Sequence, residues 1–271
     1  MREQIVVAEE TKTSRKFGEY KIQLVKPAAA RVTLITSSQL PTRAMYLITR
    51  AYKGIYRETI STEDKEEYSV GQAFLDIQNT KLQTPLEMIH TLWLLQDVTR
   101  AFTHQLVRYR VGTSFVQESM RFFGMKGVFK VLITHSAADP NIWTEVPDGL
   151  HAIHQPNLDE YMRAVCVSIG TYVELIERGV PSEDARGVLP TNILTNIYFD
   201  CSFRTLQGIF PQRLCCQAQQ GEWQPILNEM RDIILAEMGS EMEALLRAPY
   251  ELGKPCGYRA SFDRPCIWQK E

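Results

Sequence analysis

The sequence predicts an α+β protein with a mostly antiparallel central sheet and long flanking helices. Short β-branched or alternating segments, typical of strands, occur at residues 20–25, 31–36 and 128–134. Long stretches with helical periodicity occur at residues 157–176 and 223–238. These segments do not follow the regular strand–helix–strand order of a parallel α/β sheet, which favours the α+β class.

The composition indicates an ordinary globular protein. Of its 271 residues, 44% are hydrophobic, 23% charged and 10% aromatic, which excludes a disordered or fibrous chain. The 30 Lys and Arg residues are balanced by 32 Asp and Glu residues, so no global positive field favours nucleic-acid binding. We find neither a signal peptide nor a run of 18 apolar residues, and we therefore expect a cytoplasmic protein without a membrane partner.

The N-terminal half contains several predicted elements in order. After the two first strands, Pro41 occupies a typical first helical position, and that helix ends by Gly54. Residues 57–72 are polar and are interpreted as a connection. Thr84-Pro85-Leu86-Glu87 has the capping-box pattern, with Thr84 as the N-cap of at least one helical turn. A β-like segment then runs from His90 to Leu95.

Helices dominate the rest of the chain. A helix containing Gln105 is capped by Asp97 or Thr99, and the segment 135–156 is interpreted as a loop. The further predicted elements are a helix from Asn157 that ends at Gly179, a short helix from Ser182, an apolar segment 192–199, and helices at 203–219 and 223–238. From Pro249 the sequence turns irregular, so we divide the chain into a globular unit, residues 1–248, and an extension, residues 249–271.

The chain lacks the glycine signatures of common nucleotide sites. The nearest pattern, Gly124-Met-Lys-Gly127, has too few glycines for a Rossmann fingerprint or a P-loop. Any phosphate must therefore be bound by arginines and helix N-termini, because a guanidinium makes bidentate contacts with phosphate oxygens.

A cluster of arginines follows the helix that contains Gln105. Arg108 and Arg110 would point about 200° apart on a helix but to one side of an extended segment. Gly112 next to Thr113 predicts that the helix unwinds there, so both arginines could face one ligand. Spacing alone does not distinguish such a site from a solvated, salt-bridged surface.

A second group of polar residues follows shortly after. Ser119 and Arg121 are two residues apart and would share a face of a strand, with the Gln117 amide nearby. Together the two groups offer three cations, a hydroxyl and an amide.

The stretch from Gln105 to Arg121 resembles the signature of the flavin-dependent thymidylate synthase (ThyX) family, an Arg-His-Arg followed seven residues later by Ser-x-Arg. Further elements resemble the family in the same order: Thr84–Glu87, Ala185–Pro190, Phe203–Leu206, Gln212-Arg213 and Ala218-Gln219. The resemblance covers roughly residues 20–240, and several independent motifs are more specific than any one.

The resemblance implies a ThyX-like catalytic domain over residues 1–248. It further implies reductive methylation of dUMP to dTMP, with FAD as cofactor, methylenetetrahydrofolate as one-carbon donor and NADPH as reductant, in a homotetramer with shared active sites. By motif position, the residues that would bind the flavin are Thr84, Arg108, Arg110, Gln117 and Arg204. Those that would bind dUMP are Gln105, Arg108, Gln117, Ser119, Arg121, Arg186 and Arg213. Arg213 would act as the catalytic cation that polarises the uracil.

The chain departs from the family pattern at several positions. Tyr109 replaces a His, Val116 replaces Asn or Ser, and one extra residue lies between Arg110 and Ser114. The other departures are Leu82, Phe122, Ser202, Gly208 and Gln217. Two alternatives therefore stay open: an enzyme making a different C5 modification, such as hydroxymethylation, of a pyrimidine nucleotide, or a flavin- or nucleotide-binding protein that has lost catalysis.

No metal site is expected. His151 and His154 form a pair without a third ligand, and Cys256 and Cys266 lack nearby histidines.

Other reactive or aromatic residues have structural interpretations. Cys215 and Cys216 are not expected to act as nucleophiles, since the family mechanism needs none. Trp93, Phe102, Phe115 and His90 are interpreted as core residues.

Overall fold

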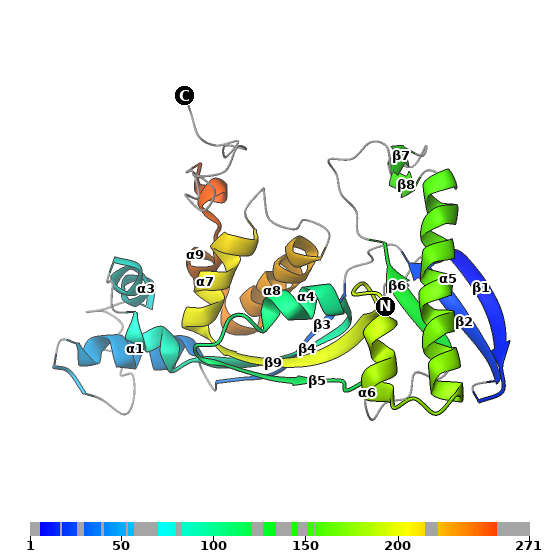
Figure 1. Cartoon of the computed structure of the whole chain (residues 1–271). Helices are drawn as coiled ribbons and strands as arrows, with labels where there is room; N and C mark the ends of the chain where they lie inside the picture. Colours follow the sequence, from blue (N-terminus) through cyan, green and yellow to red (C-terminus); the bar gives the residue numbers. More distant parts are fainter. Residues whose placement is uncertain are drawn as a thin grey trace, which may run out of the picture.

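The described part of the computed structural model contains a four-stranded and a three-stranded sheet with helices packed against them, and a separate two-stranded hairpin (Figure 1). The structure describes residues 6–16, 18–25, 30–38, 41–52, 54–56, 70–79, 83–120, 127–133, 143–145, 151–153, 155–214 and 222–253. In this part of the chain, no helix is long and apolar enough to span a bilayer.

The larger sheet has four antiparallel strands in the order β3 (Arg31–Ser37), β4 (His90–Thr99), β9 (Leu194–Ser202) and β5 (Thr113–Gln117). The alternation of side chains along β4 and β9 places Trp93 and Phe199 in the core and leaves Leu94 and Tyr198 on the opposite face. Helices lie on one face of this sheet, and Figure 1 shows no described helix across the other.

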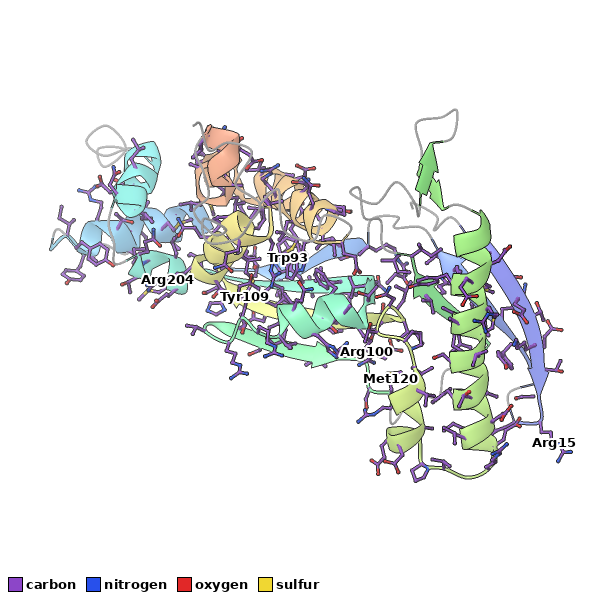
Figure 2. All side chains as sticks on the ribbon, turned by 45° about the horizontal axis from the view of Figure 1, so that its top comes forward. Arg15, Trp93, Arg100, Tyr109, Met120 and Arg204 are labelled. Carbon is purple, nitrogen blue, oxygen red and sulfur yellow. The ribbon has the colours of Figure 1, made fainter. Side chains whose placement is uncertain are left out.

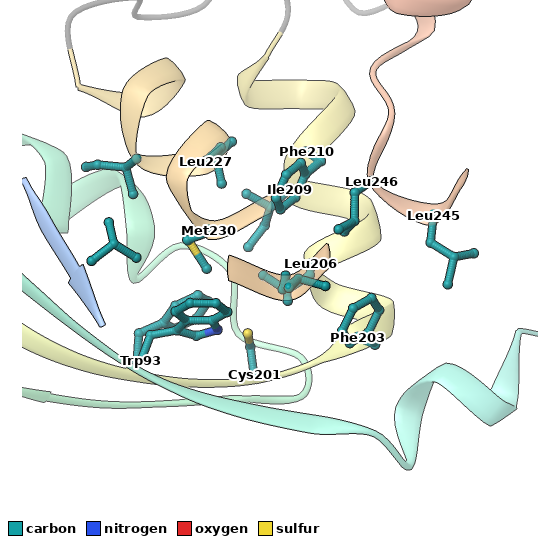
Figure 3. Close-up of a cluster of buried hydrophobic side chains, with 14 of the residues drawn as sticks. Trp93, Cys201, Phe203, Leu206, Ile209, Phe210, Leu227, Met230, Leu245 and Leu246 are labelled. Carbon is teal, nitrogen blue, oxygen red and sulfur yellow. The ribbon is translucent and has the colours of Figure 1, made fainter. Parts of the chain in front are cut away.

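The helices on this sheet are α4 (Arg100–Leu106), α7 (Phe203–Arg213), α8 (Trp223–Met238) and the short α9 (Glu243–Leu246), with 3-10 turns at Ser240–Met242 and Pro249–Leu252. Their apolar faces pack on Trp93 and Cys201 of the sheet through Phe203, Leu206 and Met230 (Figure 3). Described residues between Ala30 and Leu106 and between Ile197 and Ala248 thus share one core.

The smaller sheet has the order β1 (Val6–Ser14), β2 (Gly18–Val25) and β6 (Val128–Leu132), with β1–β2 antiparallel and β2–β6 parallel. It packs against α5 (Gln155–Glu177), whose Ile169 and Tyr172 contact Ile22 and Phe129. After α5 come α6 (Ser182–Ala185) and the 3-10 turn η2 (Arg186–Val188). A β-bridge between Val131 and Ile193 and a hydrogen bond from Leu132 N–H to the carbonyl of Asn192 connect this region to the start of β9.

The remaining elements are α1 (Pro41–Ala51), α3 (Val70–Asn79), the 3-10 turn η1 (Thr84–Glu87) and the hairpin of β7 (Trp143–Glu145) and β8 (His151–Ile153). Figure 1 shows α1 and α3 beside the end of the large sheet that is remote from α5.

The predicted α+β class is confirmed, and α8 has the predicted bounds. The prediction missed β1 and the β7–β8 hairpin, and it extended the polar connection 57–72 into α3, which begins at Val70. Polar residues interrupt β1, and each hairpin strand has only three residues, so their strand conformation depends on pairing with a neighbour. The division at residue 248 stays a prediction, and residues 254–271 lie outside the described residues.

Candidate functional site

The site is built where β4 continues into α4. Thr99 caps α4: its Oγ1 accepts a hydrogen bond from the backbone N–H of Phe102 at 2.9 Å. Thr99 in turn donates its N–H and its hydroxyl to the two carboxylate oxygens of the buried Glu222, at 2.9 and 2.5 Å. Burial raises the pKa of Glu222, because the charged form is poorly solvated there. Of the two predicted caps, Thr99 is therefore the one used.

The chain leaves the helix immediately after α4. The helix ends at Leu106, and Arg108 to Gly112 form a turn before β5, so the predicted unwinding is confirmed. Gly112 has φ of +63°, and a Cβ there would lie 2.7 Å from Ser202 Oγ. Ser202 Oγ also accepts from Thr205 N and caps α7. Glycine thus lets the turn lie directly against the start of α7.

This turn forms one wall of a cavity of about 530 Å³. η1 contributes Glu87, and α7 contributes Arg204, which forms an ion pair with Glu87. The lining residues are Glu87, Arg108, Tyr109, Arg110, Val111, Gly112, Ser202, Arg204, Thr205, Gly208 and Gln212. Three arginines and one glutamate leave a formal excess of two positive charges in the lining.

Arg213, the last residue of α7, lies in a network of neutral partners. Its Nε donates to the phenol oxygen of Tyr109 and its Nη1 to Gln105 Oε1, both at 2.9 Å. The indole N–H of Trp223 donates to the same Gln105 oxygen at 2.9 Å. The guanidinium lies 4.6 Å from the centre of the Trp223 ring and 5.6 Å from that of Tyr109. These contacts bring together two predicted substrate residues, Gln105 and Arg213.

A second polar group lies toward the junction with the small sheet. Gln117 at the end of β5 donates to Thr103 Oγ1 at 2.9 Å, and Arg100 donates to the carbonyl of Glu118 at 2.7 Å. Burial lowers the pKa of Arg100, and the positive charge of Arg186 adds to this effect. Figure 2 shows Arg100 and Met120 toward α6, with Tyr109 and Arg204 at the other end of the sheet.

The predicted site residues therefore fall into separate groups. Arg108, Arg110 and Arg204 line the cavity; Gln105 and Arg213 form the network beside it. Gln117 ends β5, and Arg186 begins η2, from where its charge acts on Arg100. Ser119 follows the end of β5, so it does not share a strand face with Arg121 as predicted. Arg121 lies outside the described residues, as do Leu82, Phe122 and Gln217.

The predicted role of Thr84 as a helix cap is wrong. The residue before η1 is Gln83, which has φ of +46° and makes no capping hydrogen bond through its side chain. Thr84 is itself the first residue of the turn and is not among the residues that line the cavity, whereas Glu87 of the same turn is.

Sequence reasoning missed Trp223 and Gln212. Trp223 opens α8, and Gln212 precedes Arg213, but only the folded chain shows that Tyr109 joins Gln212 to Arg213. The predicted core positions of Trp93 and Phe102 are confirmed, and Phe115 is half-buried and packs against the same core. His90 is exposed instead: its ring nitrogen lies 3.3 Å from Asp200 on the open face of the sheet.

A metal centre finds no support among the described residues, where no three His, Cys, Asp or Glu side chains are grouped to hold an ion. His154, Cys256 and Cys266, as well as Cys215 and Cys216, lie outside the described residues.

Comparison with known proteins gives consistent matches over most of the chain. The family model described as "Thymidylate synthase complementing protein" matches residues 29–238. A flavin-dependent thymidylate synthase from Sulfurisphaera tokodaii is 31% identical over 173 residues, covering 64% of this chain and 60% of the relative. One from Geobacter sulfurreducens is 29% identical over 210 residues, covering 75% and 82%.

The chain spans about three fifths of the length of the Sulfurisphaera relative and of its counterpart from Saccharolobus solfataricus. Among solved structures, a UMP/dUMP methylase, PolB, from Streptomyces cacaoi bound with 5-Br dUMP aligns with a TM-score of 0.59 and 18% identity, covering 81% of this chain and 95% of that chain. At that identity the likeness shows a shared fold.

Proposed function

The chain belongs to the thymidylate synthase complementing protein family, and on this premise we propose that it is a flavin-dependent thymidylate synthase. It would methylate dUMP reductively to dTMP with FAD as cofactor, methylenetetrahydrofolate as one-carbon donor and NADPH as reductant. The relatives with 31% and 29% identity carry the name of this activity.

The observation that carries the proposal is the positive cavity beside α4. Its formal excess of two positive charges matches the two negative charges of a flavin dinucleotide's diphosphate, and arginine is suited to bidentate phosphate contacts. Arg108 and Arg110 come from an unwound turn and Arg204 from the first turn of α7, so their side chains reach one cavity from two elements. Gly112 supports this arrangement, since it removes the Cβ that would separate the turn from Ser202.

We propose roles for the motif residues from their positions in the family motifs. Thr84, Arg108, Arg110 and Arg204 would hold the flavin nucleotide, with Gln117 between flavin and substrate. The residues that would bind dUMP are Gln105, Arg108, Ser119, Arg121, Arg186 and Arg213.

Arg213 would stabilise the negative charge that develops on the uracil when C5 becomes nucleophilic. Among the described residues no carboxylate forms an ion pair with it, and its hydrogen-bond partners Tyr109 and Gln105 are neutral. Its positive charge is therefore preserved for the reaction, and a pre-oriented cation stabilises a transition state without reorganising. When bound, the reduced flavin supplies the hydride.

We further propose a homotetramer with shared sites. On the open face of the large sheet, Tyr198 is paired with Leu94 on one side and Val116 on the other, and Val116 and Tyr198 are 69% and 43% exposed. An apolar row across an uncovered sheet face is typical of a subunit contact. Figure 2 shows Arg100, on which the charge of Arg186 acts, well apart from Arg204 of the cavity, and this separation supports completion of each site by a neighbouring chain. Light scattering of the purified protein tests this proposal, and a monomer at micromolar concentration would contradict it.

The proposed activity is tested by purification and assay. The protein should be yellow or take up FAD, and dUMP should stimulate NADPH oxidation in the presence of methylenetetrahydrofolate. The assay should include UMP and dCMP, with product masses measured directly. A colourless protein that does not bind FAD would refute the proposal.

A second candidate is a different C5 modification of a pyrimidine nucleotide. It is favoured by Tyr109 in the cavity wall and by the exposed Val116, both at positions where the family pattern is polar or ionisable. A hydroxymethyl product would be heavier than dTMP by one oxygen atom. Flavin reduction without any nucleotide product would instead indicate a binding protein without catalysis.

A further inference from the structure

We propose that Tyr109 is a positioning residue that connects the occupant of the cavity to Arg213. The inference rests on the proposed function, in which the cavity holds the flavin nucleotide and Arg213 faces the pyrimidine. It concerns a residue at which this chain departs from the family pattern, where histidine is expected.

Tyr109 separates the cavity from Arg213. Tyr109 and Gln212 belong to the cavity lining, whereas Gln105, Arg213 and Trp223 do not. One side of the phenol therefore meets the cavity, and the other side meets the guanidinium, whose centre lies 5.6 Å from the Tyr109 ring centroid.

A chain of hydrogen bonds runs across this wall. The Tyr109 hydroxyl donates to Gln212 Oε1 at 2.9 Å and accepts from Arg213 Nε at 2.9 Å. Arg213 continues the chain to Gln105, whose oxygen also receives the indole N–H of Trp223. A ligand that contacts Gln212 in the cavity thereby acts on the atoms that orient Arg213.

The geometry fixes Arg213 tightly. Two of its nitrogens donate to different residues, and its central carbon lies over the Trp223 ring, 4.6 Å from the centroid; that ring is inclined 75° to that of Tyr109. Rotation of the guanidinium would break both hydrogen bonds and the cation–π contact. Trp223 is itself buried against Phe102, with ring centroids 4.4 Å apart, so the whole group is anchored in the core.

The chemistry of the phenol explains why a tyrosine suits this position. A hydroxyl can donate one hydrogen bond and accept another at once, as it does here. Phenylalanine would keep the ring but leave Arg213 Nε and Gln212 Oε1 without this partner. Histidine could accept from Arg213 only as the neutral imidazole, because both ring nitrogens of the protonated form are donors.

The test compares Tyr109→Phe and Tyr109→His with Tyr56→Phe, a matched removal of a hydroxyl from a tyrosine that is 81% exposed. We expect Tyr109→Phe to bind FAD within about twofold of wild type. We expect its kcat with saturating dUMP to fall about tenfold, the factor for loss of one hydrogen bond to a charged group.

Tyr109→His should turn over faster than Tyr109→Phe at high pH and lose this activity as the pH falls through the ordinary imidazole pKa of about 6.5. We expect no such pH-dependent loss of kcat from position 109 in wild type, which has no imidazole there. A purely structural tyrosine would not introduce this ionisation. Thermal melts check that each variant is folded.

A ligand-independent measurement separates this inference from the proposed function. In protein labelled with ¹⁵N-arginine, the Arg213 Nε–H signal, identified by its loss in Arg213→Lys, should exchange with solvent about tenfold faster in Tyr109→Phe than in wild type. If wild type binds no FAD, the proposed function fails, whereas the exchange rate still reports whether Tyr109 holds Arg213. Unchanged exchange, or an active wild type whose turnover is unaltered by Tyr109→Phe, would overturn the inference.

Discussion

The four-stranded and the three-stranded sheet are both covered by an apolar core, but only the four-stranded sheet supports residues that line the cavity. In the small sheet, β2, β6 and α5 bury Ile22, Phe129 and Tyr172, and no residue there lines the cavity. In the large sheet, the same kind of apolar layer supports the ends of α4 and α7, from which Arg108 and Arg204 project. The difference shows that the candidate site depends on how helix ends meet above one sheet.

We expect the largest effects from removing one buried aromatic side chain from each core, because this tests whether each core supports stability alone or also the cavity. Trp93→Ala and Phe129→Ala each remove a fully buried aromatic ring, and each should lower the free energy of unfolding by about 3–5 kcal/mol. Only Trp93→Ala should also weaken FAD binding by the folded protein. Urea unfolding and a flavin titration measure the two quantities. Equal losses of flavin affinity would show that both sheets support the cavity.

Removing a cavity charge should weaken ligand binding without comparable loss of stability. Arg204→Gln should raise the Kd for FAD by about 10–100-fold, since a charge-assisted contact contributes roughly 1.5–3 kcal/mol. Arg163→Gln is the control, because Arg163 pairs with Glu160 on the exposed surface of α5. Isothermal titration should show no change for the control, and equal effects would refute the assignment of Arg204.

Two glycines with positive φ distinguish contact from backbone strain. Gly112→Ala would place a Cβ 2.7 Å from Ser202 Oγ, whereas Gly127→Ala, before β6, would meet no atom of the described residues within 4 Å. Both variants carry the strain of a left-handed backbone, about 1 kcal/mol. Gly112→Ala should cost a further 1 kcal/mol or so, since Ser202 must rotate away from the N-cap of α7. If urea unfolding shows equal losses of unfolding free energy in the two variants, residue 112 does not lie in close contact with Ser202.

The two regions should also respond oppositely to pH. Burial raises the pKa of Glu222, so its stabilising contribution is complete below the ordinary carboxyl pKa of 4.5 and is lost as pH rises through the higher folded value. The hydrogen bond from Cys166 lowers the pKa of Glu10, so its contribution is present above 4.5 and is lost as pH falls through the lower folded value.

Glu222→Gln should therefore reduce the decline of stability above pH 4.5, and Glu10→Gln should reduce the decline below it. Unfolding curves of both variants and wild type across this range provide the measurement. A Glu222→Gln profile parallel to wild type above pH 4.5 would show that Glu222 does not titrate abnormally.

Local features of the fold were predictable from the sequence. Periodicity predicted the bounds of α8, and the Gly112-Thr113 pair correctly indicated that Arg108 and Arg110 lie outside the helix, because both depend on residues close together in the chain. The predicted helix cap at Thr84 is wrong, although Thr84 and Glu87 have the spacing of a capping box. Glu87 forms an ion pair with the distant Arg204 instead of a hydrogen bond to the backbone of its own turn.

Motif order selects candidate site residues but not their arrangement. Gln105 and Arg213, whose roles stay predictions, make a contact that joins positions about 100 residues apart, and Trp223 donates to the same Gln105 oxygen. No local pattern specifies which of the arginines share a cavity. Arg108 lines the cavity and Ser119 does not, because the extended strand β5 lies between them, which the short spacing in sequence does not reveal.

The pairing of β4 with β9 has a consequence for synthesis of the chain. Thr99 pairs with Leu194 and His90 with Ser202. After β4 has been synthesised, about 100 further residues, including the whole of α5, must therefore be made before its partner strand β9 leaves the ribosome. At ~5–20 residues per second, this delay is roughly 5–20 s. During that time the small sheet with α5 can be completed first, while the apolar residues of β4 remain available to chaperones.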